Sequence, residues 1–311
     1  MNKYVGEVIV LYEELEEIVS EKSTIIYDEI MANHTSFKIG GKADVFVVAN
    51  SNEDLIQVIE YAKKNNIPLF IIGNGSNLLV SDKGIRGVVI KLGDFFREVN
   101  VEGEYVIAGS ACSINAVAQK ALEGSLSGFE WAFGIPGSIG GAIFMNAGAY
   151  GGSMSDVVYE TTYLDEEYNL CVLENTKHDF GYRKSAFKSG DIKGIILSTK
   201  LKLKNGDQKD IWDEMQKYIN ARIEKQPLNM PSAGSVFKRP DGYFAGKLIE
   251  DSGLKGFKVG GAQVSEKHAG FIVNSGDATA NDVKELIKYI QNKVKENYNV
   301  ELETEIMEVG E

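Results

Sequence analysis

Glycine is concentrated between residues 124 and 152, and this concentration constrains the fold more than any other feature of the sequence. Nine of these 29 residues are glycine, where average usage gives about two. The whole chain has 33 glycines in 311 residues but only 5 prolines, which is unlike a flexible linker. Glycine without proline is typical of backbone with positive φ angles or of backbone that another group approaches closely. The stretch therefore predicts tight turns around a bound group or closely packed helices.

Two glycine loops are candidates for phosphate binding. One is GNGSN at residues 73–77, and the other is GIPGSIGGA at residues 134–142. Because glycine has no Cβ, successive N–H groups can face one concavity, and such a nest or a helix N-terminus binds phosphate oxygens. Neither loop matches the G-x-G-x-x-G pattern of a Rossmann fold, since Leu78 replaces the third glycine of the first loop, and no P-loop motif is present. The alternative is that both loops only make turns and allow close packing.

Composition and charge exclude several classes of protein. Hydrophobic residues make up 43% and charged residues 25% of the chain, so it has enough apolar material for sizeable cores. The formal net charge of -12 has the wrong sign for a general nucleic-acid binder. The two cysteines, Cys112 and Cys171, are too few for a disulfide framework, and the three histidines show no metal-ligand spacing. No apolar run approaches about 18 residues, the length that a membrane-spanning helix needs. From these observations together we expect a cytoplasmic protein with no metal, membrane or nucleic-acid partner.

Hydrophobic periodicity predicts a protein of mixed helices and strands. The expected helices lie at residues 8–19, 52–65, 113–123 and 210–224, with a fifth that begins at Thr279. The expected strands lie within residues 32–49 and at 68–72, which we expect to be buried, 87–92, 105–109, 157–165, 168–174, 194–204 and 300–309. The polar, turn-rich segment at residues 204–210 is the best candidate for a domain boundary.

Six motifs follow one another in the order of a known family. They are HTSFKIGGKAD, GNGSNLLV, GFEWAFGIPGSIGGAIFMNAGAYG, GYRKSAFK, AGSVFKRP and LETEI. Together they resemble the UDP-N-acetylenolpyruvoylglucosamine reductases, flavoenzymes of peptidoglycan synthesis, from about Asn33 to Glu305. The resemblance implies FAD as bound cofactor, NADPH as hydride donor and a UDP-linked enolpyruvyl sugar as substrate. In this family hydride passes from NADPH to the flavin and then to the vinyl carbon, which yields UDP-N-acetylmuramate.

The resemblance also implies a fold, an α+β architecture of the vanillyl-alcohol-oxidase (PCMH) type. Two α+β lobes, at about 36–93 and 94–204, would hold FAD and follow an N-terminal helical segment at 1–35. A third α+β domain at 205–311 would bind the substrate, and its terminal strand would return to the active site. This fold binds FAD through glycine loops unlike the Rossmann loop, which explains the failed fingerprint. We expect a monomer.

The family motifs place both glycine loops around the FAD diphosphate. The residues that the resemblance assigns to FAD are Gly73, Asn74, Gly75, Ser76, Asn77, Gly134, Ile135, Pro136, Gly137, Ser138, Gly140, Gly141 and Asn146. From the residues alone, ordinary turns stay an open alternative at these positions.

Three residues match the family's catalytic positions. Hydride addition to the vinyl carbon leaves negative charge on the carbon beside the carboxylate, so the site needs a cation and a proton donor. Arg183 in GYRKS matches an arginine that can bind a carboxylate through two hydrogen bonds. Ser235 in AGSVFK matches the proton donor, and Glu305 in LETEI matches a glutamate that stabilises the enol. Strand periodicity alone puts Glu303 and Glu305 on one exposed face and does not choose between them.

A basic cluster near residues 222–239 suits a substrate that carries a diphosphate. Its cations, set against the single acid Glu224 in a chain of net charge -12, are Arg222, Lys225, Lys238 and Arg239. By family position the expected substrate contacts are Lys225, Lys238, Arg239 and His268. From the residues alone, His268 is more typical of a packed or capping histidine.

The sequence departs from one branch of the family and leaves two other functions open. Residues 241–264 lack the tyrosine-bearing insertion of some members, so the chain resembles the shorter type II branch, in which another group must close over the substrate. A different flavoprotein of the same fold, such as an alcohol or sugar oxidase, would share the FAD loops. A nucleotide-binding sensor would use the loops only to hold a ligand.

Overall fold

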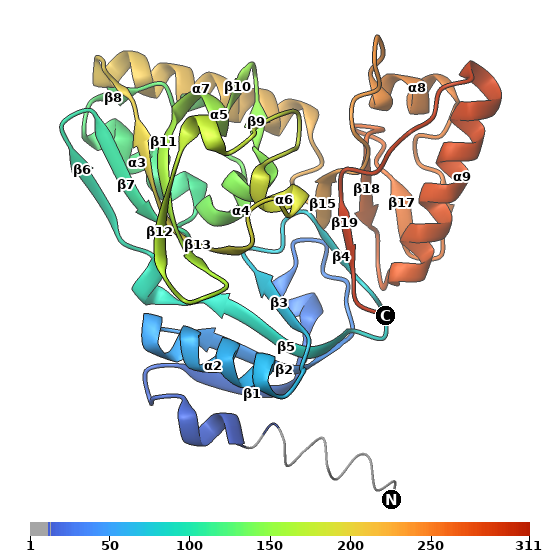
Figure 1. Ribbon diagram of the computed structural model, residues 1–311. Helices are drawn as coiled ribbons and strands as arrows, with labels where there is room; N and C mark the ends of the chain where they lie inside the picture. Colours follow the sequence, from blue (N-terminus) through green and yellow to red (C-terminus); the bar gives the residue numbers. More distant parts are fainter. Residues whose placement is uncertain (1–11, 13) are drawn as a thin grey trace, which may run out of the picture. The chain divides into compact units, whose positions relative to one another are not determined.

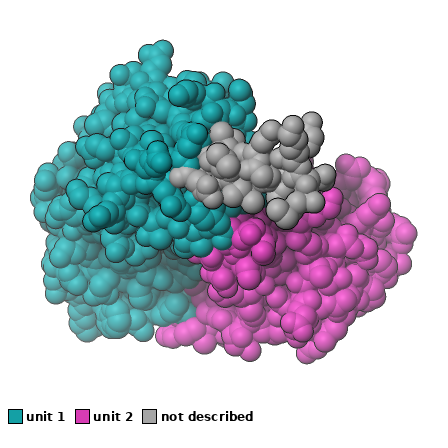
Figure 2. All heavy atoms as spheres, turned by 90° about the horizontal axis from the view of Figure 1, so that it is seen from below, with its two compact units in different colours: residues 1–27, 44–74, 87–219 teal, residues 28–43, 75–86, 220–311 magenta. Residues whose placement is uncertain are grey.

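The chain folds into two compact units, each built from separate stretches of sequence (Figure 2). The computed structural model describes residues 12 and 14–311. Unit 1 comprises the described residues up to Tyr27, Asp44–Asn74 and Gly87–Ile219. Unit 2 comprises Asp28–Ala43, Gly75–Arg86 and Asn220–Glu311. The chain therefore passes between the units five times, once within the glycine loop at residues 73–77.

A four-stranded sheet in the order β1-β2-β5-β3 lies mostly in unit 1 (Figure 1). Its strands are β1 (Thr24–Ile30), β2 (Lys42–Ala49), β5 (Ile85–Leu92) and β3 (Leu69–Ile72). The helix α2 (Asn52–Lys64) begins as predicted, because the Ser51 hydroxyl accepts a hydrogen bond from the Asp54 N–H at 3.0 Å. Leu55, Val58 and Ala62 on its buried face pack in one core with residues of β2.

A five-stranded antiparallel sheet in the order β12-β11-β13-β7-β6 forms the rest of unit 1. Its strands are β6 (Val99–Glu102), β7 (Tyr105–Gly109), β11 (Val158–Asp165), β12 (Leu170–Glu174) and β13 (Gly194–Lys202). The helices are α3 (Ile114–Glu123), α4 (Ile139–Met145), α5 (Met154–Val157), α6 (Ala186–Ser189) and α7 (Gln208–Lys225), of which α7 continues into unit 2. Two short strand pairs are β8 (Leu126–Ser127) with β14 (Lys204–Asn205) and β9 (Gly148–Ala149) with β10 (Gly152–Ser153). Ile139 and Ile143 bury α4 in the core of this part.

Unit 2 is built around a four-stranded sheet in the order β15-β18-β17-β16. Its elements are β15 (Ser232–Ser235), α8 (Ala245–Asp251), β16 (Lys258–Val259), β17 (Ala262–Val264), β18 (Phe271–Asn274) and α9 (Ala280–Tyr298). The predicted apolar stripe of α9, Val283, Leu286, Ile287, Ile290 and Val294, is buried. Phe37, Ile39 and Leu79 lie far away in the sequence but are buried in the same core. The strand β4 (Leu78–Val80) pairs in parallel with β19 (Met307–Val309), so early and late segments of the chain build this unit together.

The α+β fold class is confirmed, and most predicted elements are present. The strand predicted at 300–309 is wrong for its first part, because only Met307–Val309 form a strand and the preceding residues pair through a single bridge, Phe237 with Thr304. The strand predicted to be buried at 68–72 exists as β3, but Leu69 and Ile71 are 36% and 37% exposed at the edge of the sheet.

Two predictions are not tested by the described structure. The helix predicted at 8–19 lies partly outside the described residues, although residues 12 and 14–18 are helical. The predicted domain division stays a prediction; the last passage between the compact units falls at Ile219 and Asn220, inside α7.

In residues 12 and 14–311, no helix is long and apolar enough to cross a membrane. The same residues contain no cluster of three or more His, Cys, Asp or Glu side chains that could hold a metal ion.

Candidate cofactor and substrate site

The glycine loop at residues 134–141 leads into α4, and unit 1 itself uses most of the loop's N–H groups. Those of residues 134–135 and 139–141 donate to acceptors within the protein. The N–H groups of Gly137 and Ser138 have no acceptor in the described part of the chain, although both residues are buried. Buried N–H groups without an acceptor are rare in folded proteins. These two amides therefore fit a bound acceptor such as a phosphate oxygen.

The two predicted glycine loops meet within unit 1. Asn74 Nδ2 donates a hydrogen bond to the Pro136 carbonyl at 3.2 Å. A Cβ atom at Gly73 would overlap the Ser138 hydroxyl, so a larger residue there would displace the N-cap hydroxyl of α4. This is the close approach that the glycine content predicted.

Ser110 lies beside the loop and was missed by the sequence analysis. It is 4% exposed, and its hydroxyl has no hydrogen-bond partner among the residues that the structure describes. Its carbonyl accepts a hydrogen bond from the Gly140 N–H at 2.9 Å, which places Ser110 next to the first turn of α4. A buried hydroxyl without a partner costs free energy, so Ser110 also fits a bound polar group. The only signal in the sequence was a serine directly after strand β7, which is too common to assign a function.

Arg183 belongs to unit 1 and lies in a two-residue turn between Gly181 and Lys184. The N–H of each flanking residue donates to the carbonyl of the other at 3.1 Å. Arg183 has a φ angle of 54°, a left-handed conformation that residues other than glycine rarely adopt. Its guanidinium donates to the Gly148 carbonyl at 3.3 Å and lies 5.2 Å from the centroid of the Tyr182 ring. The side chain is therefore fixed on a tight turn and not spread freely into solvent.

The side chain of Asn146, which the resemblance assigned to FAD, makes two hydrogen bonds within the protein. Nδ2 donates to the Gly181 carbonyl at 2.8 Å, and Oδ1 accepts from the Ser155 N–H at 3.0 Å. Asn146 is 7% exposed and ends α4 in the left-handed conformation, with a φ angle of 43°. These contacts connect the end of α4 with the turn that carries Arg183.

In unit 2, the second half of the first glycine loop contacts the C-terminal segment. Gly75 has a φ angle of 60°, and a Cβ atom there would overlap the His34 carbonyl, so this position requires glycine. Asn77 Nδ2 donates to the Glu305 carbonyl at 3.1 Å, and the Asn77 carbonyl accepts from the Met307 N–H at 2.9 Å. The loop therefore fixes the main chain of Glu305.

Unit 2 also brings Ser235 and Glu305 together. Ser235 ends β15 after an irregularity in the strand, where Gly234 has a φ angle of 79°. The carbonyl of the next residue, Val236, accepts a hydrogen bond from the Glu305 N–H at 2.7 Å. Both side chains are half-buried. A hydroxyl and a carboxylate thus lie on adjacent segments of main chain.

The structure distinguishes Glu305 from Glu303, which periodicity could not do. Glu303 is exposed, and its Oε2 lies 2.8 Å from Lys238 Nζ, a hydrogen bond that lowers the pKa of Glu303. Glu305 is half-buried, and its main chain is bound on both sides by Asn77 and Val236. Lys238, an expected substrate contact, is therefore already paired with a carboxylate.

The other expected substrate residues differ in their surroundings. Lys225 is exposed near the end of α7. Arg239 is also exposed, with its guanidinium 4.0 Å from the centroid of the Phe244 ring. His268 is partly buried: its Nδ1 accepts from the Gly270 N–H at 3.1 Å, and burial lowers its pKa below the usual 6.5. His268 is therefore a packed, neutral side chain, as the sequence alone suggested for this residue type.

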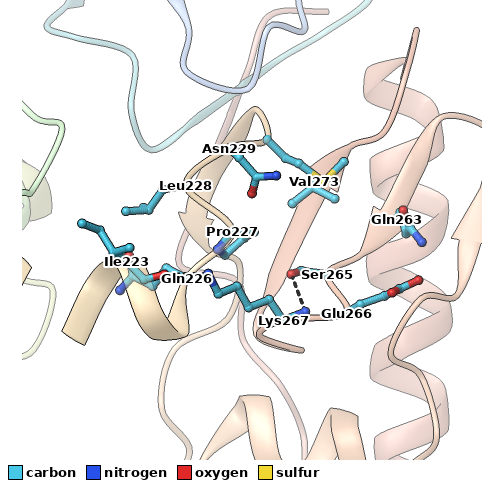
Figure 3. Close-up of a pocket in the computed structure, with 11 residues that line it drawn as sticks. Ile223, Gln226, Pro227, Leu228, Asn229, Gln263, Ser265, Glu266, Lys267 and Val273 are labelled. Atoms are coloured by element: carbon cyan, nitrogen blue, oxygen red, sulfur yellow. Dashed lines mark hydrogen bonds between the residues drawn. The ribbon is translucent and has the colours of Figure 1, made fainter. Parts of the chain in front are cut away.

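A pocket of about 650 Å³ opens within unit 2 (Figure 3). Its lining consists of Ile223, Gln226, Pro227, Leu228, Asn229, Met230, Gln263, Ser265, Glu266, Lys267 and Val273. Lys267 Nζ donates to the Ile223 carbonyl at 2.6 Å, and the Lys267 N–H donates to Ser265 Oγ at 3.2 Å. Pockets for small organic ligands measure about 300–1,000 Å³ and combine apolar walls with a few polar groups. The size and lining of this pocket match that description, and the sequence analysis named none of its residues.

Two family profiles match the chain. One is described as an FAD binding domain and matches residues 43–167, a range that contains both glycine loops and Ser110. The other is described as the C-terminal domain of UDP-N-acetylenolpyruvoylglucosamine reductase and matches residues 226–309, a range that contains Ser235 and Glu305.

Curated and solved proteins match over nearly the whole length. The UDP-N-acetylenolpyruvoylglucosamine reductase of Caldanaerobacter subterraneus subsp. tengcongensis is 52% identical over 302 residues, which cover 97% of this chain and 99% of the relative. The protein of the same name from Alkaliphilus oremlandii is 49% identical, with 96% and 98% covered. The crystal structure of UDP-N-acetylenolpyruvylglucosamine reductase (MurB) from Thermus caldophilus matches with a TM-score of 0.80 at 33% identity, with 93% of this chain and 99% of that chain covered. The chain therefore belongs to the UDP-N-acetylenolpyruvoylglucosamine reductase family of FAD-dependent oxidoreductases and has the vanillyl-alcohol-oxidase type of fold.

Proposed function

We propose that this chain reduces UDP-N-acetylglucosamine enolpyruvate to UDP-N-acetylmuramate, with NADPH as hydride donor and FAD as bound cofactor. The observation that carries the proposal is the pairing of Ser235 with Glu305 in unit 2, through the hydrogen bond of 2.7 Å from the Glu305 N–H to the Val236 carbonyl. A hydroxyl and a carboxylate on adjacent segments suit the protonation of a carbanion beside a carboxylate. We place the reaction in peptidoglycan synthesis in the cytoplasm and expect a monomeric enzyme.

The residues of unit 1 fit the diphosphate of FAD. The N–H groups of Gly137 and Ser138 are assigned to its phosphate oxygens, and the buried hydroxyl of Ser110 is assigned as a further donor. Gly73 has no side chain that would project toward the Ser138 hydroxyl. When bound, FAD supplies the ring that accepts hydride from NADPH and delivers it to the substrate. The N–H groups of residues 134–135 and 139–141 have acceptors in the protein, so Gly137 and Ser138 are the donors of this loop that we assign to FAD.

Arg183 is assigned to the carboxylate of the enolpyruvyl group. A guanidinium donates two parallel hydrogen bonds to a carboxylate and balances the negative charge that develops on the enolate. Such stabilisation is most effective when the donors are fixed before the reaction. The contacts of the Arg183 turn with Gly148 and Asn146 provide that fixation.

Ser235 is assigned as the proton donor and Glu305 as the group that stabilises the enol. A serine hydroxyl is a weak acid, but a carbanion is a far stronger base, so transfer is favourable once the hydroxyl lies within hydrogen-bond distance. Glu305 can act through its own proton or through a water molecule. Main-chain contacts with Asn77 and Val236 fix the position of Glu305.

The nucleotide end of the substrate is assigned to the exposed cations and to the pocket of unit 2. Lys225 and Arg239, both exposed, are assigned to the diphosphate. Lys238 is paired with Glu303. The pocket of about 650 Å³ is lined by Ile223 and Gln226, on either side of Lys225 in the sequence, and its amide side chains can match the donors and acceptors of a uracil ring.

Anaerobic spectroscopy on the purified holoenzyme tests the proposal. We expect flavin absorption that NADPH bleaches and that UDP-N-acetylglucosamine enolpyruvate restores. Protein that takes up no FAD, or reduced enzyme that the enolpyruvyl substrate fails to re-oxidise, would contradict it. Bleaching of the flavin by an alcohol or a sugar would instead favour an oxidase of the same fold.

A further inference from the structure

The helix α4 joins two functional segments of unit 1. Its N-cap is Ser138, at the end of the glycine loop assigned to FAD, and its C-cap is Asn146, which contacts the turn of Arg183. The helix has seven residues, Ile139–Met145, and therefore spans about 10 Å at 1.5 Å per residue. Ile139 and Ile143 are fully buried, so the helix is fixed in the core of the unit.

The turn of Arg183 needs support from its surroundings. A φ angle of 54° at a residue with a long side chain is unfavourable, and such strain persists only where neighbouring groups hold it. Two hydrogen bonds close the turn, but both lie within the turn itself, between Gly181 and Lys184. They fix the shape of the turn and not its place in the molecule.

Lys188 Nζ on α6 donates to the Arg183 carbonyl at 3.0 Å, and three further contacts of the turn and the residues beside it come from the end of α4 and the residues just after it. Asn146 Nδ2 donates to the Gly181 carbonyl at 2.8 Å. The guanidinium of Arg183 donates to the Gly148 carbonyl at 3.3 Å. Beyond the turn, the Ser185 hydroxyl donates to the Phe144 carbonyl at 2.7 Å. The main chain before the turn, the side chain of Arg183 and the chain after the turn are thus all attached to one short segment, residues 144–148.

Asn146 is the C-cap of α4, and it contacts the turn through its own buried side chain. Its Oδ1 accepts from the Ser155 N–H at 3.0 Å while Nδ2 holds Gly181, so both ends of the amide are occupied. Asparagine also tolerates the left-handed conformation that ends α4, with its φ angle of 43°. An amide with one donor end and one acceptor end is required here, because one neighbour is a carbonyl and the other is an N–H.

We propose that Asn146 is a positioning residue, which holds the turn of Arg183 to the end of α4 and thereby sets the distance between Arg183 and the Gly137 and Ser138 amides. This replaces the direct FAD contact that the resemblance assigned to Asn146. The inference rests on the function proposed for Arg183. It predicts that loss of the Asn146 amide disturbs the carboxylate-binding arginine and leaves the FAD loop intact.

The sharpest variant is Asn146→Asp. It keeps the acceptor for the Ser155 N–H and the tolerance of a positive φ angle, but it places a carboxylate oxygen against the Gly181 carbonyl in place of a donor. The matched control is Asn65→Asp, because Asn65 is the C-cap of α2 and its Nδ2 donates to the Tyr61 carbonyl at 2.9 Å. If Asn146→Asp fails to fold, Asn146→Gly removes the same bond without adding charge and suits the same φ angle.

The first measurement is limited trypsin digestion of the holoenzyme, with the fragments identified by mass spectrometry. Cleavage after Arg183 or Lys184 requires the turn to open. We expect Asn146→Asp to raise the rate of this cleavage about 10-fold over wild type and Asn65→Asp, with no change at Lys177, which reports general unfolding. Unchanged cleavage at the turn overturns the proposal.

The second measurement separates the half-reactions. We expect Asn146→Asp to keep its FAD content and its reduction by NADPH, while re-oxidation by the enolpyruvyl substrate slows about 10-fold. If Asn146 acts through Arg183, the substitution has no further effect in an Arg183→Ala background. An additive effect in the double variant, or loss of FAD with an intact turn, contradicts the positioning role. If wild-type enzyme is not re-oxidised by this substrate at all, the proposed function fails, and the digestion still decides whether Asn146 holds the turn.

Discussion

The two segments that carry the proposed catalytic residues are held in different ways. In unit 1, Arg183 lies in a strained turn that depends on the side chain of Asn146. In unit 2, Ser235 and Glu305 are joined through a main-chain hydrogen bond at Val236. A main-chain bond survives substitution of the neighbouring side chains, whereas a side-chain anchor is lost with one mutation. Substitutions in unit 2 therefore test chemistry alone, and substitutions around Arg183 test position as well.

The largest expected effect is that of Ser235→Ala in unit 2. We expect re-oxidation of the reduced enzyme by the enolpyruvyl substrate to slow by roughly 10²- to 10⁴-fold, which is the range for loss of a general acid. The main chain of residues 235–236 keeps its bonds to Gly270 and Glu305, so the fold should be unchanged. Stopped-flow absorption of the flavin measures both half-reactions, and reduction by NADPH should stay near normal. Two unaffected half-reactions would remove Ser235 from the mechanism.

The next effect is that of Arg183→Lys in unit 1. Lysine cannot bind a carboxylate in two places, and a hydrogen bond to a charged group is worth about 1.5–3 kcal/mol, or roughly 10- to 10²-fold in rate. Lysine also lacks the planar guanidinium that lies near the Tyr182 ring and donates to the Gly148 carbonyl. The substitution therefore removes both the two-point binding of the carboxylate and the contacts that hold the side chain in place. Stopped-flow re-oxidation is again the measurement. A variant as fast as wild type would show that one positive charge is enough, whatever its geometry.

A paired substitution sharpens the assignment within unit 2. We expect Glu305→Gln to slow re-oxidation about 10-fold and Glu303→Gln to have no measurable effect on it. The reason is that Glu303 is exposed and paired with Lys238, whereas Glu305 is half-buried beside the Ser235 segment. Steady-state rates at saturating substrate compare the two variants directly. The reverse order of effects would return the catalytic role to Glu303.

The smallest effect concerns one histidine in each unit, the buried His178 and the partly buried His268. Burial lowers the pKa of His178 in unit 1 and of His268 in unit 2 below the usual 6.5. As the pH falls below 6.5, the two histidines bind more protons in the unfolded chain than in the folded chain. Their contribution to the free energy of unfolding is therefore fully present above pH 6.5 and decreases below it. Urea unfolding on both sides of this pH, together with NMR titration of the two imidazole rings, measures it. A ring that titrates at or above 6.5 would show that its unit does not exclude the charged form.

Much of the local structure followed from the sequence because it depends on neighbouring residues. The Ser51 cap and the apolar spacing of α2, and the stripe of Val283 to Val294 on α9, are set by periodicity and capping within a few residues. The strand predicted at 300–309 failed for the opposite reason. Its alternation was real, since Leu302 and Ile306 are buried, but the segment lacks a full strand partner and pairs only through one bridge to Phe237.

The motifs predicted the residues of the candidate site, and the packing shows the surroundings of each. The glycine loops were expected to bind phosphate. In residues 134–141, most main-chain N–H groups donate to acceptors in the protein, such as Asn115 Oδ1 and the Ser110 carbonyl. The assignment of Asn146 to FAD stays a prediction, and the structure adds the contact of its side chain with Gly181. Ser110 and the pocket of unit 2 carry no motif. Burial of an unpartnered hydroxyl among the described residues identified Ser110, and the shape of the folded unit identified the pocket.

By itself the sequence determined the class of fold, the helices and strands that short-range patterns specify, and the family to which the ordered motifs belong. Only the tertiary structure decided which amides stay available, which of two glutamates adjoins Ser235 and where Asn146 points. The physical reason is that each of these depends on contacts between residues far apart in the chain, such as Asn77 with Glu305, and no periodicity or spacing encodes which partner a polar group finds when the chain folds.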